Sequence, residues 1–170
     1  MRYAKLEGII INRRAVADAD RFLTILTREE GKISVYARAV RSLKSKRSAS
    51  LDLFSLIRFE LVERGENKTL THVELLDAYR DGKKKLGDIS RLFAIGELVD
   101  ALVPENDPHP EVYDLLSTAL THLSRFDSPE YLARFKKKLL FLLGYGDAPT
   151  DIDSYIESLL SRQLRAKNIL

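Results

Sequence analysis

A short run of cations is the part of this sequence best suited to chemistry with phosphates. The ten residues from Arg38 to Arg47 hold five cations and no acid, namely Arg38, Arg41, Lys44, Lys46 and Arg47. Clustered cations attract a polyanion through counterion release and a focused surface potential, and neither effect needs base-specific contacts. The run therefore predicts a phosphate-binding loop. The alternative is a solvated loop that only keeps the chain soluble.

The charge of the chain is unevenly distributed, which strengthens this prediction. Residues 1–50 hold 12 Lys and Arg against 5 Asp and Glu, whereas residues 51–170 hold 16 against 20. The formal net charge of +3 thus hides a basic N-terminal part joined to a mildly acidic remainder. This asymmetry indicates that the N-terminal part is the one that meets a polyanion.

A catalytic centre is not indicated by the remaining polar residues. His72, His109 and His122 fall in different predicted elements, without the spacing of metal ligands or of a nucleophile and its base. The absence of Cys excludes thiolate ligands, disulfides and a Cys nucleophile, and no glycine-rich phosphate loop is present. We expect no catalysis, no cofactor and no metal. The enzymatic alternative is a metal-dependent nuclease that acts through Asp18 or Asp20.

The apolar residues form no segment long enough to cross a membrane. Hydrophobic residues make up 45% of the chain, but no run approaches the ~18 consecutive apolar residues that a span requires. The first residues carry charges and do not resemble a targeting signal. The composition therefore predicts a soluble, cytoplasmic protein.

The first half of the sequence alternates apolar and polar residues in period two, as strands do. Glycine-containing segments at residues 28–31 and 64–68 suit tight turns. Five short strands in about 80 residues are the pattern of a small closed or partly open barrel. We expect these strands at about residues 5–10, 21–26, 32–39, 56–63 and 69–76.

The second half changes to the spacing of helices, with starts marked by Asp88, Pro110, Pro129 and Asp151. Helices joined by short loops should pack as a small bundle. We expect helices at about residues 89–102, 110–123, 129–144 and 151–164. The predicted fold class is α+β, with an N-terminal five-stranded OB-type β-barrel followed by a C-terminal α-helical bundle. The predicted domains are residues 1–80 and 81–170, with the junction at residues 79–86.

OB-type barrels bind oligonucleotides across their middle strands, where cations contact the backbone and aromatic rings stack on bases. Lys32, Tyr36 and Arg38 share one face of the third predicted strand, and three arginines flank the turn between the first two strands. The alternative for Tyr36 is an ordinary half-exposed strand residue. We expect nucleic-acid contacts from Arg13, Arg14, Arg21, Lys32, Tyr36, Arg38, Arg41, Lys44, Lys46 and Arg47.

Several segments of the chain occur in an order that is known from one protein family. The most specific is the run Asp20-Arg21…Thr27…Gly31-Lys32. The segments lie at residues 5–10, 18–33, 37–46, 53–61, 70–76, 98–105 and 134–146. Together they resemble the bacterial recombination mediator family RecO over most of residues 1–146.

The resemblance implies an OB-fold followed by helices, with no catalysis. It implies binding of single- and double-stranded DNA and annealing of complementary strands, in a nucleoid-associated bacterial protein that works with RecR and with the recombinase RecA. It also implies that the helical part takes up the acidic, apolar-ended C-terminal tail of the single-stranded DNA-binding protein. By position, the matching helix offers Arg134, Phe135, Lys137, Lys138 and Leu142. The alternative is a plain amphipathic helix with solvated lysines.

The sequence departs from the family pattern after Gly146. Many members insert a four-cysteine zinc module there, but this chain has no cysteine, so we expect no zinc. The sequence fits a natural short form as well as a piece of a longer protein. The leading hypothesis is a non-enzymatic DNA-binding mediator of recombination repair. A protein-interaction adaptor and an RNA-binding OB-fold protein remain the alternatives, and preference for RNA over DNA would identify the latter.

Overall fold

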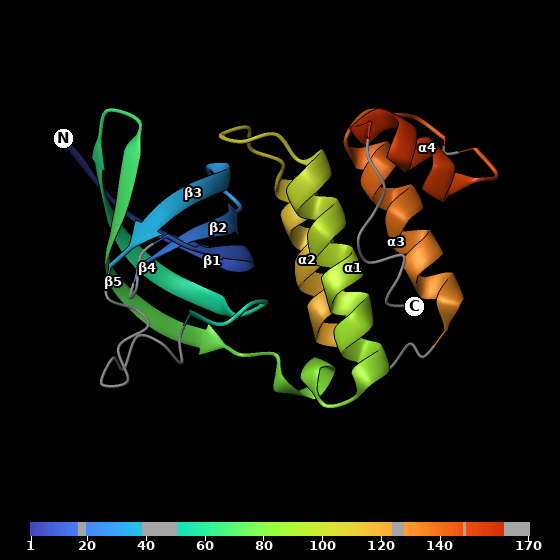
Figure 1. Cartoon of the computed structure of the whole chain (residues 1–170), viewed down its shortest axis with the longest axis horizontal. Coiled ribbons are helices and arrows are strands. Elements are labelled where there is room, and N and C mark those ends of the chain that lie inside the picture. The colour runs from blue at the N-terminus through green and yellow to red at the C-terminus, as the bar shows by residue number, and fades with distance from the viewer. Residues whose placement is uncertain (17–19, 39–50, 124–127, 148, 162–170) are drawn as a thin grey trace.

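The computed structural model describes residues 1–16, 20–38, 51–123, 128–147 and 149–161. Five strands form the N-terminal part: β1 (Arg2–Ala15), β2 (Arg21–Thr27), β3 (Gly31–Ala37), β4 (Leu56–Arg64) and β5 (Asn67–Asp77). They pair in the closed order β1-β2-β3-β5-β4, as the curved sheet in Figure 1 shows. This confirms the α+β class and the five-stranded N-terminal sheet.

The seam between β3 and β5 is the narrowest part of the sheet. All other neighbouring strands pair antiparallel over most of their length, whereas β3 and β5 pair parallel through one register pair, Tyr36 with Thr69. Every second side chain along each strand points into the interior of the sheet and fills it. They include Ile10, Leu23, Ile25, Ile33, Val35, Ile57, Phe59 and Leu61, all fully buried.

The C-terminal part is helical, as predicted. A 3-10 turn η2 (Arg80–Lys83) leads into α1 (Leu86–Leu102), α2 (Pro110–His122), α3 (Pro129–Leu142) and α4 (Ile152–Leu160). One start was predicted wrongly, because α1 begins after Lys85 and Asp88 lies inside its first turn, paired with Arg91. None of the helices in the described ranges has the length and apolarity to span a membrane.

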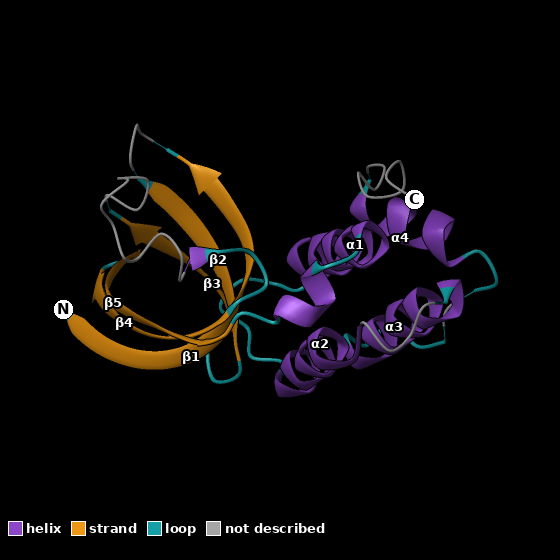
Figure 2. Cartoon of the chain, turned by 90° about the horizontal axis from the view of Figure 1, so that it is seen from below, coloured by secondary structure: helices purple, strands orange, loops and turns teal. Residues whose placement is uncertain are grey.

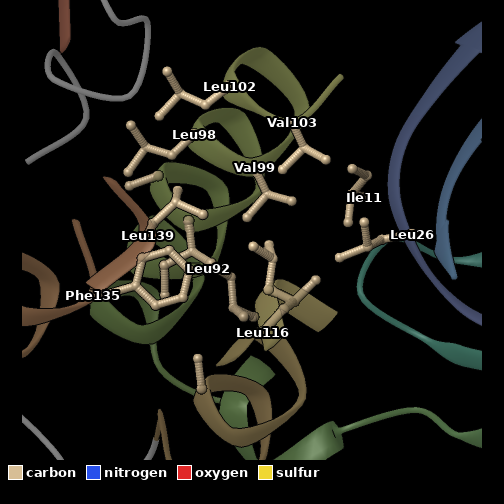
Figure 3. Packing of buried hydrophobic residues seen from close by; sticks show 14 of the residues in the cluster. Ile11, Leu26, Leu92, Leu98, Val99, Leu102, Val103, Leu116, Phe135 and Leu139 are labelled. Atoms are coloured by element: carbon tan, nitrogen blue, oxygen red, sulfur yellow. The ribbon is translucent and has the colours of Figure 1, made fainter. Parts of the chain in front are cut away.

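A second core joins the helices to the outside of the sheet. Figure 2 shows α1 and α2 beside the strands, and Figure 3 shows Ile11 and Leu26 of the sheet meeting Val99 and Leu116 of these helices. Phe54 packs so closely on α1 that a Cβ on Gly96 would lie 2.5 Å from its ring. The helices therefore cover part of the outer surface of the sheet, which limits where a ligand can reach it.

Candidate nucleic-acid interface

The outer face of β1, β2 and β3 brings together two aromatic rings and two arginines at one end of the strands. Arg14 pairs in register with Phe22, and Phe22 pairs with Tyr36. The rings of Phe22 and Tyr36 lie 5.3 Å apart between centroids, and the Arg14 guanidinium lies 5.6 Å from the Phe22 centroid. Arg38 follows β3 directly and is exposed. We call Arg14, Phe22, Tyr36 and Arg38 the β2–β3 patch.

A carboxylate fixes the orientation of the tyrosine in this patch. The Tyr36 hydroxyl donates a hydrogen bond to Asp20 Oδ2. This hydrogen bond is the main reason that the pKa of Tyr36 is raised above its ordinary value, while Arg38 acts in the opposite direction. The hydrogen bond holds the tip of the ring in place, and the Tyr36 side chain is partly exposed. Flat aromatic faces beside cations are what single-stranded nucleic acids bind.

Phe22 belongs to the patch but was not predicted as a site residue. It lies on the same outward phase of β2 as Thr24, whereas Leu23 and Ile25 point into the interior. Its membership could have been found from the sequence by aligning the two strands across the turn at residues 28–31, because that register places Phe22 opposite Tyr36. Period two alone gave no reason to choose it over the other apolar residues.

The two other arginines of β1 and β2 occupy different surroundings from Arg14. Arg13 forms an ion pair with Asp52 over 3.0 Å, and it lines a pocket with Phe54, Lys83 and Phe93. Arg21 is half-buried, between Ala15 and Ala37 in the register of the sheet. The structure thus places Arg14 in the β2–β3 patch and Arg13 at a separate pocket.

The structure buries Lys32 against α1, which corrects its prediction as a contact residue. Only 8% of Lys32 is exposed, because the C-terminal end of α1 lies over this part of β3. Its ammonium donates to the backbone oxygen of Asp100 and lies 3.5 Å from the carboxylate of the same residue. Asn12 also donates to that carboxylate, over 2.8 Å. Lys32 therefore joins the sheet to α1.

Four of the predicted cations, Arg41, Lys44, Lys46 and Arg47, lie outside the described residues. Their contacts with nucleic acid stay a prediction that rests on the sequence alone.

The connection between α1 and α2 lies along the edge of β3 next to the patch. Asn106 donates its backbone N–H to the Lys32 carbonyl over 2.8 Å, and Ser34 donates its hydroxyl to Glu105 over 2.9 Å. From the other side of the seam, Lys68 of β5 donates to the side chain of Asn106. In Figure 1 this yellow connection extends from the helices toward β3. It fills the part of the seam where β3 and β5 do not pair.

The turn between β2 and β3 is shaped for this close approach. Gly31 has φ +73°, and a Cβ there would lie 2.2 Å from the backbone oxygen of Asp107. Only glycine suits this position, because the left-handed backbone and the short distance both exclude a side chain. The Gly31-Lys32 pair is thus part of the junction between sheet and helices.

The predicted partner-binding helix α3 divides into a buried and an exposed face. Arg134, Lys137 and Lys138 are exposed, as expected. Phe135, however, is 4% exposed and belongs to the helical core, and Leu142 is half-buried against the same core. Phe135 is therefore corrected from a contact residue to a core residue, since Leu132 and Leu139 share its face.

The exposed aromatic residue of α3 is Phe141, which was not predicted. It is 60% exposed, and the Lys138 ammonium lies 5.7 Å from its ring centroid. The spacing i, i+3, i+4, i+7 from Arg134 to Phe141 would have predicted this shared face. We call Arg134, Lys137, Lys138 and Phe141 the α3 surface.

Among the residues with described positions, no three His, Asp or Glu side chains come together as possible metal ligands. The side chains that the structure gathers are cations, aromatic rings and hydrogen-bonding groups. Such a set binds anions and flat rings.

Comparison with known proteins gives two matching family models. The model described as "Recombination protein O N terminal" matches residues 1–79, and the model described as "Recombination protein O C terminal" matches residues 85–147. Together they cover the sheet and the first three helices.

Curated relatives with the name DNA repair protein RecO match the same region. The protein of Symbiobacterium thermophilum is 37% identical over 147 residues, or 85% of this chain and 58% of its own length. That of Pelobacter propionicus is 31% identical over 147 residues, with 85% and 60% covered, and that of Xanthomonas oryzae is 34% identical over 142 residues, with 81% and 58% covered. The matched part of the chain thus spans less than two thirds of each of these relatives.

Proposed function

The chain belongs to the RecO family of DNA repair proteins, and on that premise we propose that it is a non-enzymatic recombination mediator that binds single- and double-stranded DNA. In this proposal residues 1–80 bind DNA and residues 81–170 contact protein partners. The observation that carries the proposal is the β2–β3 patch, in which two aromatic rings and two arginines share one outer face of the sheet. Phosphates would bind the cations, and bases would stack on Tyr36 and Phe22.

Binding of this type should tolerate many sequences and should weaken with salt. Each phosphate that a cation neutralises releases counterions, so the logarithm of the binding constant falls by about 0.7 per phosphate of a single strand for each tenfold rise in salt. The patch offers stacking rather than hydrogen bonds to base edges, which explains why we expect little sequence preference.

Annealing follows from the same charges. Two complementary strands repel each other through their phosphates, and this repulsion slows their encounter. A protein that presents cations to both strands lowers the barrier without making or breaking a covalent bond. We propose that the β2–β3 patch and the cations of residues 39–50 together serve this role.

The α3 surface supports a second element of the proposal, a contact with the acidic, apolar-ended tail of the single-stranded DNA-binding protein. Arg134, Lys137 and Lys138 would pair with the acidic residues of the tail, and Phe141 would contact its apolar end. RecR and RecA are proposed as further partners on family grounds. The activity of the whole protein stays a proposal, because the match spans 58–60% of the length of these relatives.

Strand annealing tests the proposed function directly. Two complementary fluorescent oligonucleotides are mixed with wild-type protein, and the rate of duplex formation is followed by energy transfer. The triple variant Arg38→Ala, Arg41→Ala, Lys44→Ala should lose the acceleration. A matched variant, Arg80→Ala, Lys84→Ala, Lys85→Ala, removes the same charge near the junction and should keep it. Equal rates with and without wild-type protein would overturn the annealing role, and tighter binding of RNA than of DNA would favour the RNA-binding alternative.

A further inference from the structure

Glu105 is an acid placed at the edge of the face that the proposed function assigns to DNA. Its carboxylate accepts a hydrogen bond from the Ser34 hydroxyl over 2.9 Å. Ser34 and Tyr36 lie two residues apart on the same outward face of β3, which corresponds to about 6.6 Å along a strand. The carboxylate therefore lies next to the first position that a nucleic acid would reach beyond the stacked ring of Tyr36.

The described cations leave the charge of Glu105 without an ion pair. Glu105 is exposed, and within the described ranges it forms no ion pair. Two cations of the adjoining strands are engaged elsewhere, since Lys32 binds Asp100 and Lys68 donates to Asn106 and pairs with Glu63. A phosphate arriving at Ser34 would thus meet a carboxylate with which none of the described cations pairs.

The position of Glu105 is fixed by the fold. Its neighbour Asn106 is held by a backbone hydrogen bond to Lys32, and the following Asp107 lies against Gly31 so closely that no side chain fits between them. On the same side, the carboxylate of Asp100 accepts a hydrogen bond from Asn12, and the backbone oxygen of Asp100 accepts one from Lys32. The end of α1 therefore covers the middle of the outer face. The acid is therefore carried by a segment that backbone contacts hold against β3.

We infer that Glu105 sets the end of the nucleic-acid path on this barrel. This inference rests on the proposed function. Bases stack on Phe22 and Tyr36, and the strand is turned away at Ser34 by the carboxylate instead of continuing across β2 and β3 as in an open OB face. Glu105 thereby selects how much of a strand each molecule covers. Glu105 thus determines how long a stretch of the strand is bound and which course it takes over the sheet.

The isosteric variant Glu105→Gln isolates the charge, because the amide oxygen can still accept the hydrogen bond from Ser34. In water, two like unit charges about 7 Å apart repel each other, and this repulsion weakens binding by about threefold. Glu105→Gln should therefore bind single-stranded DNA roughly threefold more tightly at low salt, and it should cover more nucleotides per protein on a long homopolymer. The gain should vanish at high salt through screening.

The matched control is Glu130→Gln, which removes the same charge from the exposed first turn of α3. Circular dichroism shows that each variant is folded, and fluorescence anisotropy gives the affinity at several salt concentrations. A gain in Glu105→Gln with none in Glu130→Gln supports the inference. Equal affinities of Glu105→Gln and wild type, or equal gains in both variants, overturn it while the proposed function stands. A wild-type protein that binds no DNA overturns both.

Discussion

The rings of Phe22 and Tyr36 lie 5.3 Å apart between centroids and are inclined by 52°, across the register pair that joins β2 to β3. Neither ring belongs to the interior of the sheet, although both lie in strands whose alternate residues are fully buried. Both rings are partly exposed on the outside of the sheet. We propose that this pair, beside Arg14 and Arg38, contacts the bases of a bound strand.

Removal of the Tyr36 ring tests this explanation. Tyr36→Ala should weaken binding of single-stranded DNA by about 1–3 kcal/mol, the usual contribution of one stacked base, whereas Tyr36→Phe should keep most of the affinity. Tyr3→Ala is the matched control, because Tyr3 is 72% exposed on the same barrel. Tyr3 lies in the part of β1 that pairs with β4, and β5 separates β4 from the strand of Tyr36. Fluorescence anisotropy measures all three. Equal losses in Tyr36→Ala and Tyr3→Ala would remove Tyr36 from the site.

Lys32 should contribute to the stability of the fold and not to the binding of DNA. Lys32→Ala leaves Asp100 without its buried cation, so we expect the free energy of unfolding to fall by about 1–3 kcal/mol. Lys5→Ala removes an exposed cation that lies 3.7 Å from Glu60, and it should change stability by less than about 1 kcal/mol. Urea unfolding measures both. If Lys32→Ala instead lowers the salt dependence of DNA binding at unchanged stability, Lys32 contacts phosphate after all.

The two phenylalanines of α3 should behave in opposite ways. Phe135→Ala creates a cavity in the helical core and should cost about 3–5 kcal/mol of stability. Phe141→Ala removes an exposed ring and should leave stability nearly unchanged, but it should weaken binding of a synthetic acidic peptide with an apolar C-terminal end. Urea unfolding and peptide anisotropy separate the two effects. Undiminished peptide binding by Phe141→Ala would place the tail on another surface.

Alkaline pH should destabilise the fold through a half-buried tyrosine. Burial raises the pKa of Tyr113 from 10.0 to about 12. Its hydroxyl is therefore protonated more readily in the folded than in the unfolded chain, so its contribution is complete below pH 10 and is lost as the pH rises through about 12. Tyr113→Phe should flatten this decline, as measured by urea unfolding across that range. A variant that loses stability as steeply as the wild type would contradict the assignment.

Much of the fold could be predicted because period two and the helical spacing indicate the type of each element and which residues share one of its faces. Leu23 and Ile25, for example, share one face of a strand as the alternation predicts, and the structure buries that face in the barrel. The predicted face of Lys32 was also right, since it points away from the barrel interior. The helices that cover this outer face could not be predicted, because periodicity shows which way a residue points and not which distant segment lies over it.

The same reason explains the errors and omissions in the candidate site. Phe135 and Phe141 are both aromatic residues of one helix beside lysines, and only the packing of Leu132 and Leu139 against the core decides which of the two is exposed. Glu105 lies 71 positions from Ser34 in the chain, and no local pattern relates the two. Local patterns can therefore predict the elements, but the contacts between them follow from the tertiary fold.

The most direct test of the account is the salt dependence of single-stranded DNA binding, measured by anisotropy for the wild type and for the double variant Arg14→Ala, Arg38→Ala. The account predicts steep salt dependence for the wild type and, for the variant, weaker binding with a slope reduced by about 1.4, which is about 0.7 for each lost phosphate contact. Lys137→Ala with Lys138→Ala removes equal charge from α3 and should leave the slope unchanged. No binding by the wild type at low salt, or an unchanged slope in the Arg14 and Arg38 variant, would contradict the claim that the β2–β3 patch binds DNA.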